Sequence, residues 1–218
     1  MRIVSISDSH NNHRDINIPD GDVFICAGDI TNFNRSRKHY IDFNEWLGTL
    51  PHSKKIIIAG NHDELFQRQP EVARGLMTNC IYLEDSEVII DGVKFYGSPW
   101  QKWFYDWAFN FPPRSIVAAK MKWAEIPDDT DVLITHSPPH QICDVNTMGE
   151  NIGCEMLAER VFEVQPKIHV FGHIHESAGR YGTIGNTLFF NVCNDRDKNM
   201  GYIIDLEDNV ASVKDIKC

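Results

Sequence analysis

Residues 55–63 read Lys-Ile-Ile-Ile-Ala-Gly-Asn-His-Asp, so a polar tetrapeptide directly follows an apolar run. A run that is apolar at every position is typical of a strand buried on both faces. The Gly-Asn pair suits a tight turn, because both residues tolerate a positive φ. This segment therefore predicts a buried strand at 54–59 that carries polar side chains at its carboxyl end.

Similar short strands recur along the chain, separated by helical stretches. Strands are also expected at 2–7, 22–27, 87–90, 93–97, 131–135, 167–171, 186–192 and 200–206. Helices are expected at 36–48, 70–77, 114–124 and 153–164, and Asp91-Gly92 predicts a hairpin between two strands. The pattern predicts an α/β fold, a two-sheet β-sandwich flanked by helices, in one domain of residues 1–218.

Five of the expected strands end in residues that can bind metal. Asp8 and His10 follow the first strand, Asp29 the second, Asn61 the third and His136 the strand at 131–135. His173 and His175 follow the strand at 167–171. In a mainly parallel sheet the carboxyl ends of the strands lie along one edge, where ligands bind. We therefore expect these residues to meet in one place.

Carboxylate, imidazole and amide donors suit manganese, iron or zinc without any thiolate. Seven donors are too many for one structural zinc, which takes four, and fit two ions about 3.5–4 Å apart that share a carboxylate. Each motif alone is readily explained as a turn, and it is their order at separate strand ends that favours a metal centre. The predicted ligands are Asp8, His10, Asp29, Asn61, His136, His173 and His175.

The composition of the chain limits the kinds of molecule that it is expected to bind. The net charge is −10, and the densest basic cluster is Arg35-Ser36-Arg37-Lys38, so a long nucleic acid is not the expected substrate. No apolar run reaches the ~20 residues of a membrane helix, and the first residues lack the features of a signal peptide. We expect a cytoplasmic protein without a membrane partner. Its scattered cysteines, six in all, are expected to be reduced.

The ordered set of strand-end motifs resembles the calcineurin-like metallophosphoesterase superfamily. Segments 96–100 (Tyr-Gly-Ser-Pro-Trp), 130–139 (Thr-Asp-Val-Leu-Ile-Thr-His-Ser-Pro-Pro) and 169–176 (His-Val-Phe-Gly-His-Ile-His-Glu) are similar to its metallophosphoesterase-domain-containing subfamily. The resemblance implies a phosphodiesterase that acts on small diesters, cyclic nucleotides among them. The alternatives are a phosphomonoesterase or protein phosphatase of the same superfamily, and a non-catalytic scaffold with this fold.

The resemblance also implies roles for the residues. Asp8, His10 and His175 would hold one ion, and Asn61, His136 and His173 the other, with Asp29 bridging both. The ions would be Mn²⁺, with Fe, Zn, Ni or Co as alternatives. A hydroxide shared by the ions would attack phosphorus. His62 would stabilise the transition state or protonate the leaving group, and Asp63 would orient His62 by accepting its other N–H.

Three further expectations concern residues outside these motifs. His52 is expected at the surface and His169 in a core strand, and His13 is expected at the surface, with a contact to a metal ligand or to substrate as the alternative. Residues 97–113 hold three of the five tryptophans, which indicates either a small aromatic core under a long loop or a pocket wall on which a base stacks. The oligomeric state is left open.

Overall fold

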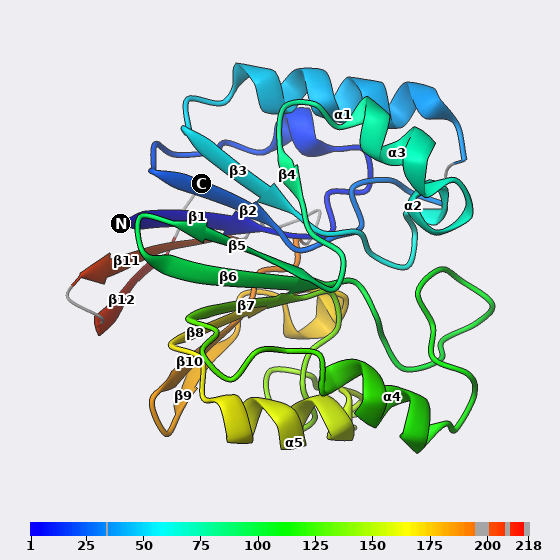
Figure 1. The fold of residues 1–218 in the computed structure, drawn as a ribbon, viewed down its shortest axis with the longest axis vertical. Helices are drawn as coiled ribbons and strands as arrows, with labels where there is room; N and C mark the ends of the chain where they lie inside the picture. Colours follow the sequence, from blue (N-terminus) through cyan, green and yellow to red (C-terminus); the bar gives the residue numbers. More distant parts are fainter. Residues whose placement is uncertain (34, 195–200, 208–209, 216–218) are drawn as a thin grey trace.

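The computed structural model describes residues 1–33, 35–194, 201–207 and 210–215. Within these residues the chain forms two mixed six-stranded sheets that lie face to face, with helices on their outer surfaces (Figure 1). This is the α/β sandwich that the sequence predicts. The layers run helix, sheet, sheet, helix, and each sheet is therefore covered on both faces.

The first sheet has the strand order β12-β11-β1-β2-β3-β4. Strands β1 to β4 are parallel, and β11 and β12 add antiparallel neighbours on the other side of β1. Because β1, β2 and β3 run the same way, the loops that follow them leave from one edge. The strands are β1 (Arg2–Ile6), β2 (Val23–Cys26), β3 (Lys54–Ile57), β4 (Ile81–Tyr82), β11 (Tyr202–Glu207) and β12 (Val210–Asp215).

The second sheet has the order β5-β6-β7-β8-β10-β9, in which β6, β7, β8 and β10 are parallel. The predicted hairpin joins β5 and β6. Asp91 and Gly92 have φ of 50° and 80°, as a tight hairpin turn of this length requires. The strands are β5 (Ser86–Ile90), β6 (Val93–Ser98), β7 (Val132–Thr135), β8 (Ile168–Phe171), β9 (Tyr181–Ile184) and β10 (Thr187–Asn191).

The helices pack through apolar stripes at helical spacing. α1 (Arg37–Thr49) buries Tyr40, Phe43, Trp46 and Leu47 in a core it shares with the first sheet. Burial of each such side chain contributes about 1.5–3 kcal/mol. α2 (Glu64–Arg68) and α3 (Pro70–Leu76) cover the same sheet, and α4 (Ile116–Trp123) and α5 (Glu155–Val164) cover the second one (Figure 1).

A separate apolar core fills the space between the sheets. Ile25 and Ile56 of the first sheet and Phe95, Val132 and Val170 of the second are all fully or almost fully buried there. Since each sheet has this core on one face and helices on the other, its central strands are apolar at successive positions. This explains the continuous runs in the sequence and holds the two sheets against each other next to the loops described below.

The expected strands and helices are present, with some shifts and additions. α2, β4, β9 and β12 were not predicted: α2 and β4 are shorter than a sequence pattern can register, and three of the four residues of β9 are exposed. The last expected strand begins at Tyr202, and its first residue, Met200, lies outside the described part. Among the described residues no helix is long and apolar enough to cross a membrane.

Two histidines expected at the surface are buried, and those predictions were wrong. His13 is 1% exposed and packs against Phe43 and Trp46, and His52 is 2% exposed beside Phe24. Helix α1 covers His13, and His52, in the loop after α1, packs against Phe24 of β2, which residue type alone does not reveal. His169 is fully buried in β8, as predicted. The five described cysteines are free thiols, and Cys218 lies outside the described residues.

Candidate metal centre

The loops after β1 and β8 bring three of the predicted ligands together. Asp8 Oδ1 lies 3.6 Å from His175 Nε2, and His10 Nε2 lies 3.3 Å from the same nitrogen. One donor atom from each residue falls within 4.8 Å of the others. The aspartate is buried, whereas the His175 side chain is 45% exposed, so this group opens to solvent on one side.

A second group gathers the residues after β2, β3, β7 and β8. Asp29 Oδ2 lies 3.4 Å from His136 Nε2, and Asn61 Oδ1 lies 2.9 Å from that nitrogen. His173 offers a ring nitrogen within 4.8 Å of the Asp29 and His136 donors. The second group therefore combines side chains from both sheets.

Asp29 lies between the two groups. Its Oδ2 is 4.0 Å from His10 Nε2 and 3.7 Å from His62 Nε2, in addition to its contact with the second group. This is the position that a shared carboxylate must occupy. All seven predicted ligands thus converge, and their binding of metal stays a prediction. The structure also groups His62 with His10 and Asp29, so geometry alone leaves His62 a further donor.

The backbone at this site adopts conformations that ordinary residues avoid. Asp8, His10, Asp29 and His173 have φ of 56°, 42°, 51° and 70°, all in the left-handed region. Such conformations cost about 1–3 kcal/mol each and tend to cluster at functional sites. Because these left-handed conformations occur at four predicted ligands, they indicate that the backbone is bent here to direct the donor atoms toward one another.

Glycines let the loops pass close to the carboxylates. A Cβ at Gly60 would overlap Asp29 Oδ1, and one at Gly172 would overlap Asp8 Oδ2. The Gly-Asn-His-Asp and Gly-His-Ile-His motifs therefore need glycine for space. The carboxylates in turn accept backbone hydrogen bonds: His62 N donates to Asp29 Oδ1 at 2.8 Å, and His173 N donates to Asp8 Oδ2 at 3.0 Å.

The electrostatics of the site fit a cation. Burial alone would raise the pKa of Asp29, but His136, His62 and His10 hold it well below the ordinary value, so the carboxylate is charged. Asp8 Oδ1 is buried and has no hydrogen-bond partner among the described residues. Buried carboxylate oxygens of this kind require a positive neighbour.

His136 supports the same conclusion. Its Nδ1 lies 2.9 Å from the carbonyl oxygen of Ala27, which can only accept, so Nδ1 carries a proton. Nε2 then faces two further acceptors, Asn61 Oδ1 and Asp29 Oδ2. Although burial opposes the charged form, Asp29 and Asp8 raise the pKa of His136 to about 9. A metal ion between these atoms would interact favourably with His136 Nε2, Asn61 Oδ1 and Asp29 Oδ2, and it would take the place of the proton on Nε2.

Asp63 does not make the predicted contact with His62, and this expectation was wrong. Its carboxylate accepts hydrogen bonds from Gly60 N, Ile30 N, Thr31 N and Thr31 Oγ1, at 2.9–3.2 Å. His62 Nδ1 has no hydrogen-bond partner in the described part of the chain. Asp63 instead ties the loop after β3 to the loop after β2, because adjacent backbone N–H groups saturate its oxygens.

A cavity of about 630 Å³ opens on this cluster. Asp29, His62 and His173 form its floor, while its other walls come from two long loops. One loop presents Trp103, Phe104 and Trp107, next to Lys102. The other loop and the segment after β8 add polar residues and two aliphatic side chains: Ser137, Asn146, Thr147, Asn151, Ile152, Ile174 and Glu176.

The aromatic segment 97–113 contributes both to a small core and to the wall of the cavity, and stacking of a base on it stays a prediction. Trp100 stacks on Phe111 with ring centroids 5.6 Å apart, in the core over α4. Phe104 lies edge-on to His173 at 5.8 Å and lines the cavity. The two ends of the segment thus anchor the loop, and the exposed tip between them faces the candidate site.

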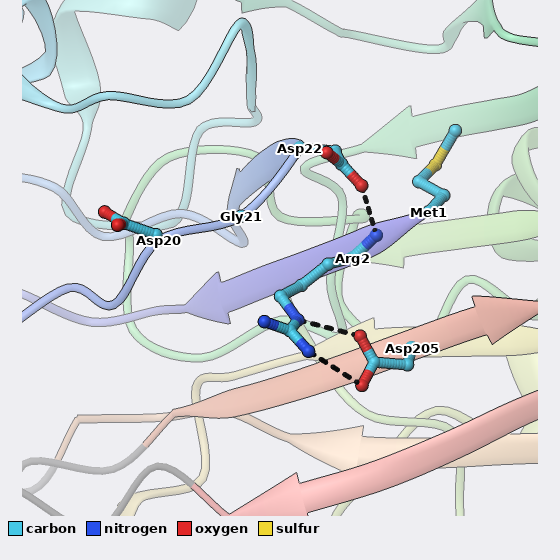
Figure 2. Close-up of a pocket in the computed structure, with 6 residues that line it drawn as sticks. All are labelled: Met1, Arg2, Asp20, Gly21, Asp22 and Asp205. Atoms are coloured by element: carbon cyan, nitrogen blue, oxygen red, sulfur yellow. Dashed lines mark hydrogen bonds and ion pairs between the residues drawn. The ribbon is translucent and has the colours of Figure 1, made fainter.

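A second cavity, of about 440 Å³, lies at the opposite end of β1 (Figure 2). Its arginine, Arg2, donates to Asp205 with Nε–Oδ1 at 2.9 Å, and Asp22 accepts from the backbone N–H of Arg2. Asp20 adds a third carboxylate to the lining. No histidine stands among the described residues that line this cavity, whereas imidazole and carboxylate donors line the cavity at the other end of the sheet.

Several residues at or beside the cavity were not predicted from the sequence. Phe33 contacts His62 and Trp107, but it stands alone in a polar stretch and gave no signal. Asn146, Asn151 and Ile152 belong to a loop without any recognisable motif. Their distance in sequence from the strand ends hides their proximity to the site.

The chain is similar in sequence and in fold to known proteins. The family model described as calcineurin-like phosphoesterase matches residues 1–177. Metallophosphoesterase domain-containing protein 1 of Homo sapiens is 42% identical over 234 residues, which cover 94% of this chain and 71% of that protein. A crystal structure from Thermus thermophilus covers 99% of both chains with a TM-score of 0.70 at 11% identity. The structure of an archaeal phosphodiesterase covers 99% of this chain and 100% of that chain, with a TM-score of 0.53 at 16% identity.

Proposed function

This chain belongs to the calcineurin-like phosphoesterase family, and on that premise we propose that it is a phosphodiesterase acting on small diesters, cyclic nucleotides above all. One observation carries the proposal: Asp29 belongs to two of the three groups of donor atoms at the floor of one cavity. A phosphoryl group bound there would meet two cations at once. The preference for diesters over monoesters rests on the similarity to the metallophosphoesterase-domain-containing proteins.

We propose the following residue roles. Asp8, His10 and His175 would hold one divalent ion, and Asn61, His136 and His173 a second, with Asp29 in contact with both. Mn²⁺ is the proposed ion. When bound, the ions would activate water for attack and neutralise charge on the phosphoryl oxygens. The donor set of oxygen and imidazole nitrogen, without thiolate, supports this choice.

The remaining chemistry would fall to His62. Its Nε2 is 3.7 Å from Asp29 Oδ2, at the floor of the cavity, where it could reach a leaving oxygen. The oxygen of water would join phosphorus, the bond from phosphorus to the leaving oxygen would break, and that oxygen would take a proton from His62, which the proton lost by the water would restore through solvent. An open diester would thus yield a monoester and an alcohol, and a cyclic nucleotide would open to a single nucleoside monophosphate. Asp63 would assist indirectly, by fixing the loop that carries His62.

The aromatic tip would bind the organic part of the substrate. Trp103, Phe104 and Trp107 line one wall, and an aromatic ring such as a base can stack on these side chains. Asn146, Thr147 and Asn151 line another part of the cavity and offer hydrogen bonds to polar edges. A flat ring with polar edges suits both surfaces, which supports nucleotides as the substrate class.

A substrate panel tests the proposal. Purified protein loaded with Mn²⁺ would be assayed on 2′,3′- and 3′,5′-cyclic nucleotides, a bis-aryl phosphodiester and an aryl phosphomonoester. The expected result is a higher kcat/KM on the diesters, highest on a cyclic nucleotide. Faster hydrolysis of the monoester would replace the proposal with a phosphomonoesterase. No hydrolysis of any ester by metal-loaded protein would indicate a scaffold.

A further inference from the structure

His62 lacks the carboxylate that commonly orients a histidine at a metal site. The neighbouring Asp63 is fully buried and uses both oxygens on the loops after β2 and β3. His62 Nδ1 is itself buried, without a hydrogen-bond partner among the described residues. Something other than a hydrogen bond to its ring must therefore fix the imidazole.

Two aromatic rings lie directly against the imidazole. The ring centroid of Phe33 is 3.5 Å from that of His62 at an interplanar angle of 41°, and that of Trp107 is 4.8 Å away at 61°. Phe33 and Trp107 also touch each other, with centroids 4.2 Å apart. The ring centroid of His10 lies 4.6 Å from that of His62. The rings of Phe33, Trp107 and His10 thus restrict rotation of the His62 side chain.

Phe33 does not sit there to fill the core. It is 41% exposed, and its backbone is in the left-handed region with φ of 49°. A bulky side chain rarely adopts this conformation, which costs about 1–3 kcal/mol. The chain therefore bends sharply, four residues after Asp29, at the residue whose ring meets His62.

Trp107 is held in place from the other side. The side-chain amide of Asn110 donates to the carbonyl of Trp107 at 3.0 Å, and also to those of Phe104 and Tyr105. The next residue, Ala108, donates its N–H to the carbonyl of Asn61 at 3.1 Å. The loop that carries Trp107 is thus tied to the backbone immediately before His62.

We propose that Phe33 and Trp107 are positioning residues, which hold the His62 imidazole toward the reacting atoms in place of an orienting carboxylate. The proposal rests on the role given to His62 in the proposed function. The rings act through shape: they leave His62 Nε2 directed at Asp29 and block the rotamers in which it would turn away. An ordinary aromatic cluster would instead only cover apolar surface, and it would not act through His62.

A double-mutant cycle separates the two cases. Phe33→Leu and Trp107→Leu would be measured in the Mn²⁺-loaded protein and again in a His62→Ala background, with a cyclic nucleotide as substrate. We expect each to lower kcat about tenfold in the parent, a part of the ~10²–10⁴-fold that a proton donor supplies. In the His62→Ala background we expect no further loss, because the residues act through one group.

A conservative variant and a spectroscopic measurement complete the test. Trp107→Phe keeps a ring and should recover most of the lost kcat. In metal-free protein with labelled histidines, the His62 ring signals, identified with His62→Ala, should move in Phe33→Leu and Trp107→Leu. They should stay in place in Trp103→Leu, which alters the same cavity wall without a described ring contact to His62.

The outcomes are distinct for the two proposals. Equal losses of kcat in both backgrounds, or His62 signals that stay unchanged in Phe33→Leu and Trp107→Leu, would overturn the positioning role. An inactive parent protein would overturn the proposed function alone, since the histidine signals would still report whether the two rings hold His62.

Discussion

Asp29 and Trp107 face the same cavity, yet the chain holds them by different means. Asp29 follows a buried parallel strand, is 1% exposed and accepts a backbone hydrogen bond from His62. Trp107 belongs to a long loop that hydrogen bonds hold in shape, among them one from the side-chain amide of Asn110 to the carbonyl of Trp107. We call the seven predicted ligands the metal half of the cavity, and the lining residues of 102–107 and 146–152 its loop half.

The loop half depends on a few polar side chains. Besides Asn110, Asp144 is fully buried and accepts hydrogen bonds from Gln141 N and Gly153 N, which closes the loop that carries Asn146 and Asn151. The metal half depends instead on two packed sheets. The difference implies that changes in the metal half should remove metal and activity together. Changes in the loop half should leave the metal in place and alter substrate binding, or kcat in the case of Trp107, which contacts His62.

The largest effect is expected at Asp29. Asp29→Asn keeps the shape but removes the charge shared between the two groups, so both metal sites should weaken. The loss of activity should exceed the roughly 10–100-fold that follows from losing a hydrogen bond to a ligand. Asp91→Asn, at the exposed β5–β6 turn, is the matched control and should keep both ions. Activity that survives Asp29→Asn would contradict the expected difference between the metal half and the loop half.

A single methyl group at Gly60 should have a smaller but still large effect. Gly60→Ala would push against Asp29 Oδ1 and displace it, so metal content measured by elemental analysis should fall. Gly75→Ala is the control, because a Cβ at Gly75 meets nothing within 4 Å. In helix α3 that change should stabilise the fold by about 0.5–1 kcal/mol. Unchanged metal content in Gly60→Ala would mean that the loop can move freely.

The smallest effect is expected in the loop half. Asn110→Ala removes the hydrogen bonds that shape the loop tip, so KM for a cyclic nucleotide should rise by about tenfold, equivalent to about 1.4 kcal/mol. Metal content should stay at the parental value. Asn79→Ala, in the turn after α3, is the control and should leave KM unchanged. Loss of metal in Asn110→Ala would show that the two halves are not independent.

The same division explains what could be predicted from the sequence. The positions of most strands and the convergence of the seven predicted ligands follow from apolar runs that end in polar residues, because parallel strands deliver their carboxyl ends to one edge. The aromatic wall at Trp103 and Phe104 was suggested by composition alone. These parts of the cavity correspond to local sequence patterns, which can be recognised in a single sequence.

Other features depend on tertiary contacts without a local pattern. Phe33 reaches His62 only because its backbone turns left-handed, and Asp63 turns from His62 because nearby N–H groups compete for its oxygens. His13 is buried because α1 lies over it. In each case the deciding partner is distant in sequence or belongs to the backbone, so residue type and spacing could not reveal it.

The central claim is that one chain holds two ions through Asp29. The most direct test is elemental analysis of protein reconstituted with Mn²⁺ and freed of loosely bound metal, with activity measured on the same sample. The account predicts two ions per chain at full activity and a loss of both on Asp29→Asn. One ion per chain in a fully active sample would contradict it.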